Sequence, residues 1–136
     1  MPYDHALKIA IVGLRHGHVG SIGPDKPGFI HTFRYLDEVD IVAYCEETDT
    51  DLLDAAHEYH PSANVYTRLD DLIANEDFDL ACVAMPANEI PAVGIKLAEA
   101  GKHFFMEKQF ARRAKDLAEM VRAVKKSGVK VLAGYP

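Results

Sequence analysis

The chain has 136 residues, of which 49% are hydrophobic and 26% charged, a composition typical of one globular domain that buries a core. Its formal charge of −6 argues against nucleic acid as the main partner, because nucleic-acid-binding proteins present a basic face. No apolar run reaches the length of a membrane span, and Met1–His5 lacks the order of a secretory signal, so we expect a cytoplasmic protein that binds no membrane.

Short apolar runs alternate with segments of helical periodicity, which is typical of βαβ units. In chain order we predict strand Lys8–Val12, helix Phe29–Leu36, strand Asp40–Cys45, helix Asp51–Tyr59, strand Asn64–Tyr66, helix Leu69–Asn75, strand Leu80–Ala84, helix Glu89–Ala100, strand His103–Met106, helix Ala114–Lys126 and strand Val129–Ala133. The strand segments are apolar nearly throughout, as expected of strands covered on both faces. We therefore predict one domain over residues 1–136: a doubly wound, mostly parallel six-stranded α/β sheet in three αβα layers, the Rossmann fold.

The least regular stretch of the chain runs from Gly17 to Gly28. It holds four glycines and two prolines, Pro24 and Pro27, and a continuous helix cannot run through such a segment. We predict a short turn after Gly17 and a loop near Gly23–Pro27.

The turn after the first predicted strand reads Gly13-Leu14-Arg15-His16-Gly17-His18. A dinucleotide-binding turn has glycine at its first, third and sixth positions. Here these positions hold Gly13, Arg15 and His18, and Gly17 comes one place early. Gly13 allows the turn, while Arg15 would crowd the backbone approach but could offer a cation to a phosphate. An ordinary strand-to-helix loop would look similar, and the five βα steps that follow favour phosphate binding.

Glu46 and Glu47 follow the second predicted strand, where a carboxylate can accept both ribose hydroxyls of adenosine. Glu46 lies 28 residues after His18 (46 − 18), beyond the usual separation of about 20, and the glycine- and proline-rich stretch accounts for the excess. A carboxylate repels a 2′-phosphate, so NAD is favoured, whereas Arg15 leaves NADP open. A solvated acid at the end of a strand is the alternative explanation.

Two further strand ends carry candidate site residues. Met85-Pro86-Ala87-Asn88 follows the fourth strand, where a proline turn can lay backbone and an amide along a cofactor or simply start the next helix. Glu107 and Lys108 follow the fifth strand, at the edge where open α/β sheets bind ligands. A lysine in a cleft can exchange a proton with a substrate hydroxyl, although lysines after strands are more often solvated.

The histidines and cysteines point to no metal or disulfide. His16-x-His18 and His57-x-x-His60 each offer two ligands, but no third ligand has suitable spacing, so we predict no metal site. Cys45 and Cys82 lie in apolar strand segments and form no Cys-x-x-Cys pair, and we expect two reduced, buried thiols.

With these residues assembled, the chain resembles the N-terminal half of the glucose–fructose oxidoreductase, inositol dehydrogenase and MocA-like (Gfo/Idh/MocA) family. The resemblance covers almost the whole chain. It is strongest in the segments Asp79–Pro86, Ala98–His103, Glu107-Lys108 and Val129–Gly134. The order of these segments is more specific than the glycine turn alone.

The resemblance implies an NAD-dependent, or alternatively NADP-dependent, oxidoreductase that oxidises or reduces a hydroxyl or carbonyl, usually on a sugar, cyclitol or small relative. It implies a set of cofactor-binding residues: Gly13, Arg15, His16, Gly17 and His18 at the pyrophosphate, Glu46 at the ribose, Pro86 and Asn88 flanking the cofactor, and Glu107 near the nicotinamide. Lys108 would contact the substrate and is the catalytic candidate.

Three residues depart from the family pattern. Gln109 stands where the family usually has proline, and we expect a trans peptide bond before it, because a cis bond there costs roughly 3 kcal/mol. Ile90 stands where a histidine is common, and Arg15 replaces the second glycine.

Members of the family continue into a second α/β domain that supplies the substrate pocket, whereas this chain ends at Gly134-Tyr135-Pro136. We therefore expect the small-molecule substrate to bind through a missing second domain, and apolar surface near the last strand to favour a homo-oligomer. Two alternatives stay open: a stand-alone nucleotide-binding or regulatory module without turnover, and a domain for another adenosine ligand such as S-adenosylmethionine or coenzyme A.

Overall fold

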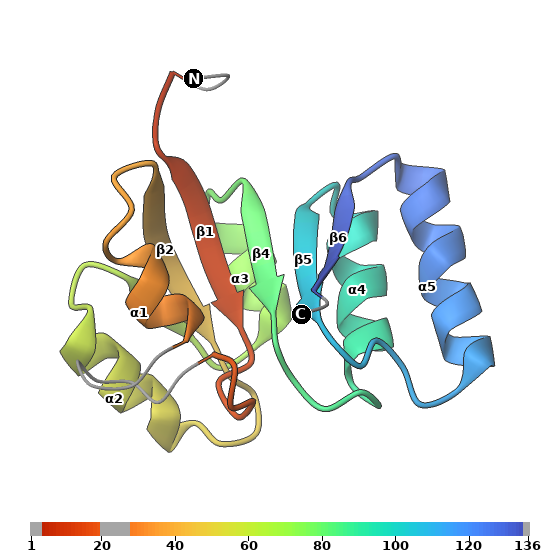
Figure 1. The fold of residues 1–136 in the computed structure, drawn as a ribbon, viewed down its shortest axis with the longest axis horizontal. Coiled ribbons are helices and arrows are strands. Elements are labelled where there is room, and N and C mark those ends of the chain that lie inside the picture. The colour runs from red at the N-terminus through yellow and green to blue at the C-terminus, as the bar shows by residue number, and fades with distance from the viewer. Residues whose placement is uncertain (1–3, 20–27, 135–136) are drawn as a thin grey trace.

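A computed structural model describes residues 4–19 and 28–134, and the loop predicted near Gly23–Pro27 lies outside them. In these residues six parallel strands form one sheet in the order β3-β2-β1-β4-β5-β6 (Figure 1). The strands are β1 (Leu7–Val12), β2 (Val39–Cys45), β3 (Asn64–Tyr66), β4 (Leu80–Val83), β5 (His103–Glu107) and β6 (Val131–Gly134). This strand order confirms the predicted doubly wound Rossmann fold.

Five helices connect the strands: α1 (Phe29–Phe33), α2 (Asp51–Tyr59), α3 (Leu69–Asn75), α4 (Ile90–Glu99) and α5 (Ala114–Ser127). Their predicted bounds are correct to within a residue or so except for α1, which ends three residues before the predicted Leu36. After Phe33 the backbone hydrogen bonds change to a spacing of three residues: the Tyr35 amide donates to the Thr32 carbonyl and the Leu36 amide to the Phe33 carbonyl. Such bonds are common where a helix ends.

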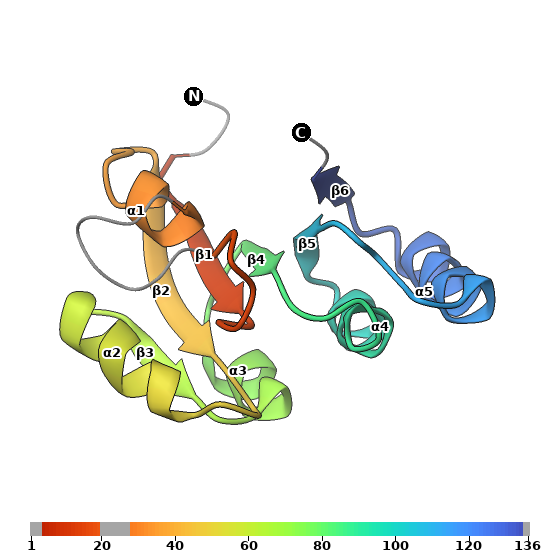
Figure 2. The same ribbon diagram turned by 60° about the horizontal axis from the view of Figure 1, so that its bottom comes forward.

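The helices cover the sheet from both sides. Side chains of α1 and α2 pack with Ile9 and Ile11 of β1, whereas those of α3, α4 and α5 pack with the alternate residues Ala10 and Val12. Figure 2 shows α1 on one side of the sheet and α4 and α5 on the other. Because successive side chains of a strand point to opposite faces, an uninterrupted apolar strand such as β1 fits only between two such layers.

The two edge strands are less buried than the sequence predicted. Val65 of β3 is 42% exposed and Leu132 of β6 is 66% exposed. Each edge strand has a single neighbouring strand, so its side chains have fewer groups to pack against. The exposed Leu132 agrees with the expected apolar surface near the last strand, and the oligomeric state stays a prediction. None of the helices in the described residues is long and apolar enough to cross a membrane.

The described structure holds a matched pair of leucines for testing the core. Leu97 of α4 is fully buried, whereas Leu132 is two-thirds exposed. We expect Leu97→Ala to lower the free energy of unfolding by about 2–5 kcal/mol, because it removes buried methyl groups and leaves a cavity. Leu132→Ala should change it by no more than about 0.5 kcal/mol. Urea denaturation of both variants checks this, and equal losses would contradict the assignment of the core.

Candidate functional site

Four segments predicted to carry the site meet at one edge of the sheet. They are the first turn Gly13–His18 after β1, Glu46 after β2, Met85–Asn88 after β4 and Glu107-Lys108 at the end of β5. All six strands are parallel, so their carboxyl ends share this edge. The strand order reverses between the neighbours β1 and β4, with β2 and β3 on one side and β5 and β6 on the other, and open α/β sheets bind ligands at such a switch point.

Gly13 fixes the path of the chain at this switch point. Its φ of +87° lies in the left-handed region, and a Cβ atom built on it would lie 2.5 Å from the carbonyl oxygen of Ala84 and 3.1 Å from the Cβ of Met85. Its amide donates to the Cys45 carbonyl at 2.9 Å. Only glycine allows this backbone to turn so close to the ends of β2 and β4.

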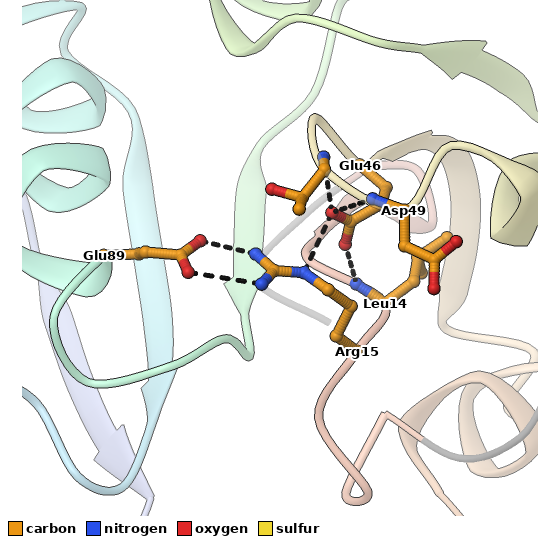
Figure 3. Close-up of polar contacts among 6 residues, drawn as sticks. Leu14, Arg15, Glu46, Asp49 and Glu89 are labelled. Carbon is orange, nitrogen blue, oxygen red and sulfur yellow. Dashed lines mark hydrogen bonds and ion pairs between the residues drawn. The ribbon is translucent and has the colours of Figure 1, made fainter.

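The carboxylate of Glu46 ties the first turn to the loop after β2 (Figure 3). Its Oε2 accepts the Leu14 amide at 2.8 Å, and its Oε1 accepts the amides of Thr48 at 2.9 Å and Asp49 at 3.2 Å. Arg15 donates its Nε–H to the same Oε1 at 3.0 Å. Three donors meet at Oε1 and one at Oε2, so a ribose hydroxyl would have to compete with them at Oε1.

These bonds hold Glu46 in its charged form although its side chain is almost fully buried. Burial raises the pKa of Glu46, but the three amides and the Arg15 cation lower it by more, so the pKa lies below its ordinary value of 4.5. Burial of a carboxylate is tolerated when hydrogen bonds replace its water.

Arg15 spans from Glu46 to a second carboxylate on the opposite wall of the site. Its two terminal nitrogens donate to the two oxygens of Glu89, the residue just before α4, with Nη1 at 3.2 Å from Oε1. The hydrogen bond to Glu89 is the main cause that raises the pKa of Arg15; desolvation opposes it, and the charges of Glu46 and Glu89 reinforce it. The sequence suggested that Arg15 could bind a phosphate; in the structure its guanidinium is paired with two carboxylates instead.

Sequence reasoning missed Glu89, which it treated only as the start of a helix. An acidic residue at a helix N-terminus is common because it interacts favourably with the helix dipole. Its partner Arg15 is 74 residues away in the chain, and no local pattern signals a contact over that distance.

A cavity of about 300 Å³ lies beside this cluster. Its polar lining comes from six strand-end and loop residues: Arg15, Glu46, Glu47, Thr48, Asn88 and Glu89. A larger cavity of about 660 Å³ opens at the other edge of the sheet, where Leu7, Lys102, His103 and Lys130 contribute to its lining and no predicted site residue does. Ligands of open parallel sheets bind at the carboxyl edge, so the smaller cavity is the candidate site.

The first turn also contacts the end of β5, as the predicted topology requires. His18 Nδ1 lies 3.1 Å from Oε1 of the buried Glu107, and the same oxygen accepts the backbone amide of Lys108 at 3.0 Å. The rings of His16 and His18 meet edge to face with centroids 4.9 Å apart. Burial, followed by the charge of His18, lowers the pKa of His16, so its ring is neutral at pH 7.

The peptide bond between Lys108 and Gln109 is cis. The expected trans bond is therefore wrong. That expectation used only the intrinsic preference of a non-proline peptide bond, whereas the packing of the surrounding chain also decides the isomer in a folded protein.

Of the remaining predicted cofactor residues, Asn88 lines the cavity, whereas Pro86 and Gly17 do not. Asn88 is exposed. Pro86 accepts the Glu89 amide on its carbonyl at 2.8 Å, so its turn does start α4. Gly17 is exposed. Their contacts with a cofactor stay predictions.

Cys45 and Cys82 are buried, as expected. They are unpaired with each other, and burial raises the pKa of each to about 12.

The histidine pair His57 and His60 lies at the end of α2, away from the cavity. Nδ1 of His60 lies 3.3 Å from the hydroxyl of Tyr44. Among residues 4–19 and 28–134, no three histidine, cysteine or acidic side chains are grouped to hold a metal.

The network around Glu46 predicts a pH-dependent stability. Glu46→Gln keeps the size of the side chain but removes the charge and puts an NH₂ group against amide donors, so we expect a loss of about 1–3 kcal/mol in unfolding free energy at pH 7. Because the folded pKa lies below 4.5, this contribution is complete above that pH and is lost as the pH falls through the folded pKa.

Urea denaturation of both proteins from pH 7 to pH 3 measures this difference, which should shrink with falling pH. Glu58→Gln, at an exposed position of α2, is the matched control and should follow the unmodified chain throughout. A constant difference between Glu46→Gln and the unmodified chain would show that the Glu46 charge is not the cause.

Comparison with known proteins identifies the family. Residues 7–135 match the profile of the Gfo/Idh/MocA family, described as an oxidoreductase family with an NAD-binding Rossmann fold. An uncharacterized oxidoreductase of Schizosaccharomyces pombe is 30% identical over 109 residues, which is 75% of this chain and 30% of that protein. The scyllo-inositol 2-dehydrogenase (NADP(+)) of Bacillus subtilis is 31% identical over 70 residues, or 52% of this chain and 21% of that protein.

Solved structures agree with this assignment. The WlbA dehydrogenase from Chromobacterium violaceum, in complex with NADH and UDP-GlcNAcA, superposes with a TM-score of 0.79 at 27% identity, covering 96% of this chain and 35% of that one. The chain thus spans about a third or less of the length of the relatives it matches. It belongs to the Gfo/Idh/MocA oxidoreductase family, of which it carries the NAD-binding Rossmann domain.

Proposed function

We propose that the chain binds NAD at the carboxyl edge of its sheet and serves an enzyme that transfers hydride between the nicotinamide and a hydroxyl or carbonyl of a sugar, cyclitol or related small molecule. The observation that carries the proposal is the cavity of about 300 Å³ beside the Gly13 turn. This volume lies at the lower end of the range for ligand sites. The B. subtilis relative is named as a scyllo-inositol dehydrogenase, and the C. violaceum structure is a complex with NADH and UDP-GlcNAcA; both support the substrate class.

The residues of the first turn and of the cavity fit a dinucleotide. Gly13 allows the first turn to pack against the chain at the end of β4, and a glycine at this first position gives the tight turn of a dinucleotide-binding loop. The ribose of the adenosine half would lie at the end of β2, where Glu46 and Thr48 line the cavity.

The residues at the end of β5 would serve the reaction. Bound NAD would accept or supply the hydride. The Lys108 amine would hold the reacting hydroxyl of the substrate and take up or return its proton, a role that lysines perform when their surroundings favour the neutral amine. Glu107 would fix the end of β5, because its buried carboxylate contacts both His18 and the Lys108 amide.

Filling the cavity tests cofactor binding. Ala92 is an exposed residue of α4 that lines the cavity, so Ala92→Phe should block the site and leave the core intact. We expect calorimetry to show NADH affinity reduced about tenfold or more, since a bulky side chain removes part of the ligand's contact area. Ala55→Phe, at an exposed position of α2 outside the cavity, is the matched control and should bind NADH normally. Absence of any heat with the unmodified, folded chain would overturn the proposal.

Replacing the catalytic candidate separates chemistry from binding. In the complete enzyme that carries this domain, we expect Lys108→Met to lower kcat by about 10²- to 10⁴-fold, the usual contribution of a proton-transfer group. The Kd for NADH should change little, because Lys108 is assigned to the substrate. Steady-state kinetics with inositols and sugars and NADH titration measure the two effects. Lys115→Met, on the exposed face of α5, is the control, and an unchanged kcat in Lys108→Met would remove Lys108 from the mechanism.

A further inference from the structure

The guanidinium of Arg15 lies between carboxylates from two walls of the cavity (Figure 3). Glu46 comes from the end of β2 and Glu89 from the start of α4. The Arg15 and Glu89 side chains are 22% and 34% exposed, whereas that of Glu46 is 1% exposed. Solvent therefore reaches Arg15 and Glu89, whereas the Glu46 side chain is covered, although Glu46 also lines the cavity.

The charges and donors of this cluster can be counted. One cation faces two anions, so the cluster carries a net charge of about −1 when Glu89 is ionised. A guanidinium has five N–H donors; one goes to Glu46 and two to Glu89. The two-pronged side of the guanidinium, which is the side that recognises phosphate in a bidentate manner, is the one that Glu89 occupies.

This cluster lies where NAD and NADP differ. The two coenzymes are distinguished by a phosphate on the 2′-oxygen of the adenosine ribose, and the acid at the end of the second strand marks the place of that ribose. That acid is Glu46, and Arg15 donates a hydrogen bond to its carboxylate. The guanidinium therefore lies next to the expected place of the ribose. A phosphate of charge near −2 would meet the net negative cluster and a guanidinium that is already paired.

We propose that Glu89 determines coenzyme specificity by acting through Arg15. While Glu89 pairs with Arg15, the site favours NAD; without the Glu89 charge, the freed side of Arg15 binds the 2′-phosphate of NADP. The inference rests on the proposed function, since it assumes that the adenosine half of the coenzyme enters this cavity. Glu89 is a positioning residue that touches the coenzyme only through its partner.

Binding titrations with NADH and NADPH test the inference on the whole 136-residue chain. In Glu89→Gln the affinity for NADPH should rise relative to that for NADH by about tenfold or more, because a negative charge near the phosphate is removed and the terminal nitrogens of Arg15 are released. Glu89→Asp keeps the charge and should keep the preference for NADH. Glu99→Gln, at the exposed end of the same helix, should behave as the unmodified chain. Adding Arg15→Met to Glu89→Gln should abolish the gain.

The outcomes are distinct from those of the cavity experiment. An unchanged NADPH-to-NADH ratio in Glu89→Gln, or a gain that persists after Arg15→Met, would overturn the role of Glu89 while leaving NAD binding in place. Failure of both coenzymes to bind the unmodified chain would overturn the proposed function and this inference with it. Competition on the unmodified chain adds a test that needs no variant: adenosine 5′-phosphate should displace NADH more effectively than adenosine 2′,5′-bisphosphate, and the reverse order would overturn the inference.

Discussion

The site depends on the buried carboxylate of Glu46. It accepts amides from the first turn and from the loop after β2, and these two loops form neighbouring walls of the cavity. A neutral side chain could not accept from all these donors, and the unsatisfied amides would be costly where they are buried. The lowered pKa of Glu46 keeps the carboxylate charged at neutral pH, so the two loops stay joined there.

The other site residues take their places from this junction and from Gly13. Gly13 brings the first turn against β4, Glu46 anchors its amide side, and Arg15 extends from the same turn to Glu89 on α4. Each of these contacts joins segments that are far apart in the chain. The segments lie close in space because the carboxyl ends of the parallel strands share one edge of the sheet. The arrangement of the charged residues therefore agrees with the Rossmann fold. They lie at the carboxyl edge of the sheet, and the buried apolar strands fix their positions.

Much of the fold was predictable because its strands are uninterrupted apolar runs and its longer helices have clear ends, such as Pro91 in the first turn of α4. The gathering of Gly13, Glu46 and Glu107 at one edge followed from the parallel topology. Local reasoning failed where distant contacts decide: the early end of α1, the exposure of Val65, the cis bond before Gln109 and the pairing of Arg15 with Glu89. It placed Glu46 at the end of β2 but explained it as a ribose ligand or a solvated acid, whereas the carboxylate is buried and accepts loop amides.

The contact between His18 and Glu107 links two parts of the site. Oε1 of Glu107 lies 3.1 Å from His18 Nδ1 and also accepts the Lys108 amide. A shift of the first turn would therefore be transmitted to the backbone of Lys108, because both contact the same carboxylate oxygen.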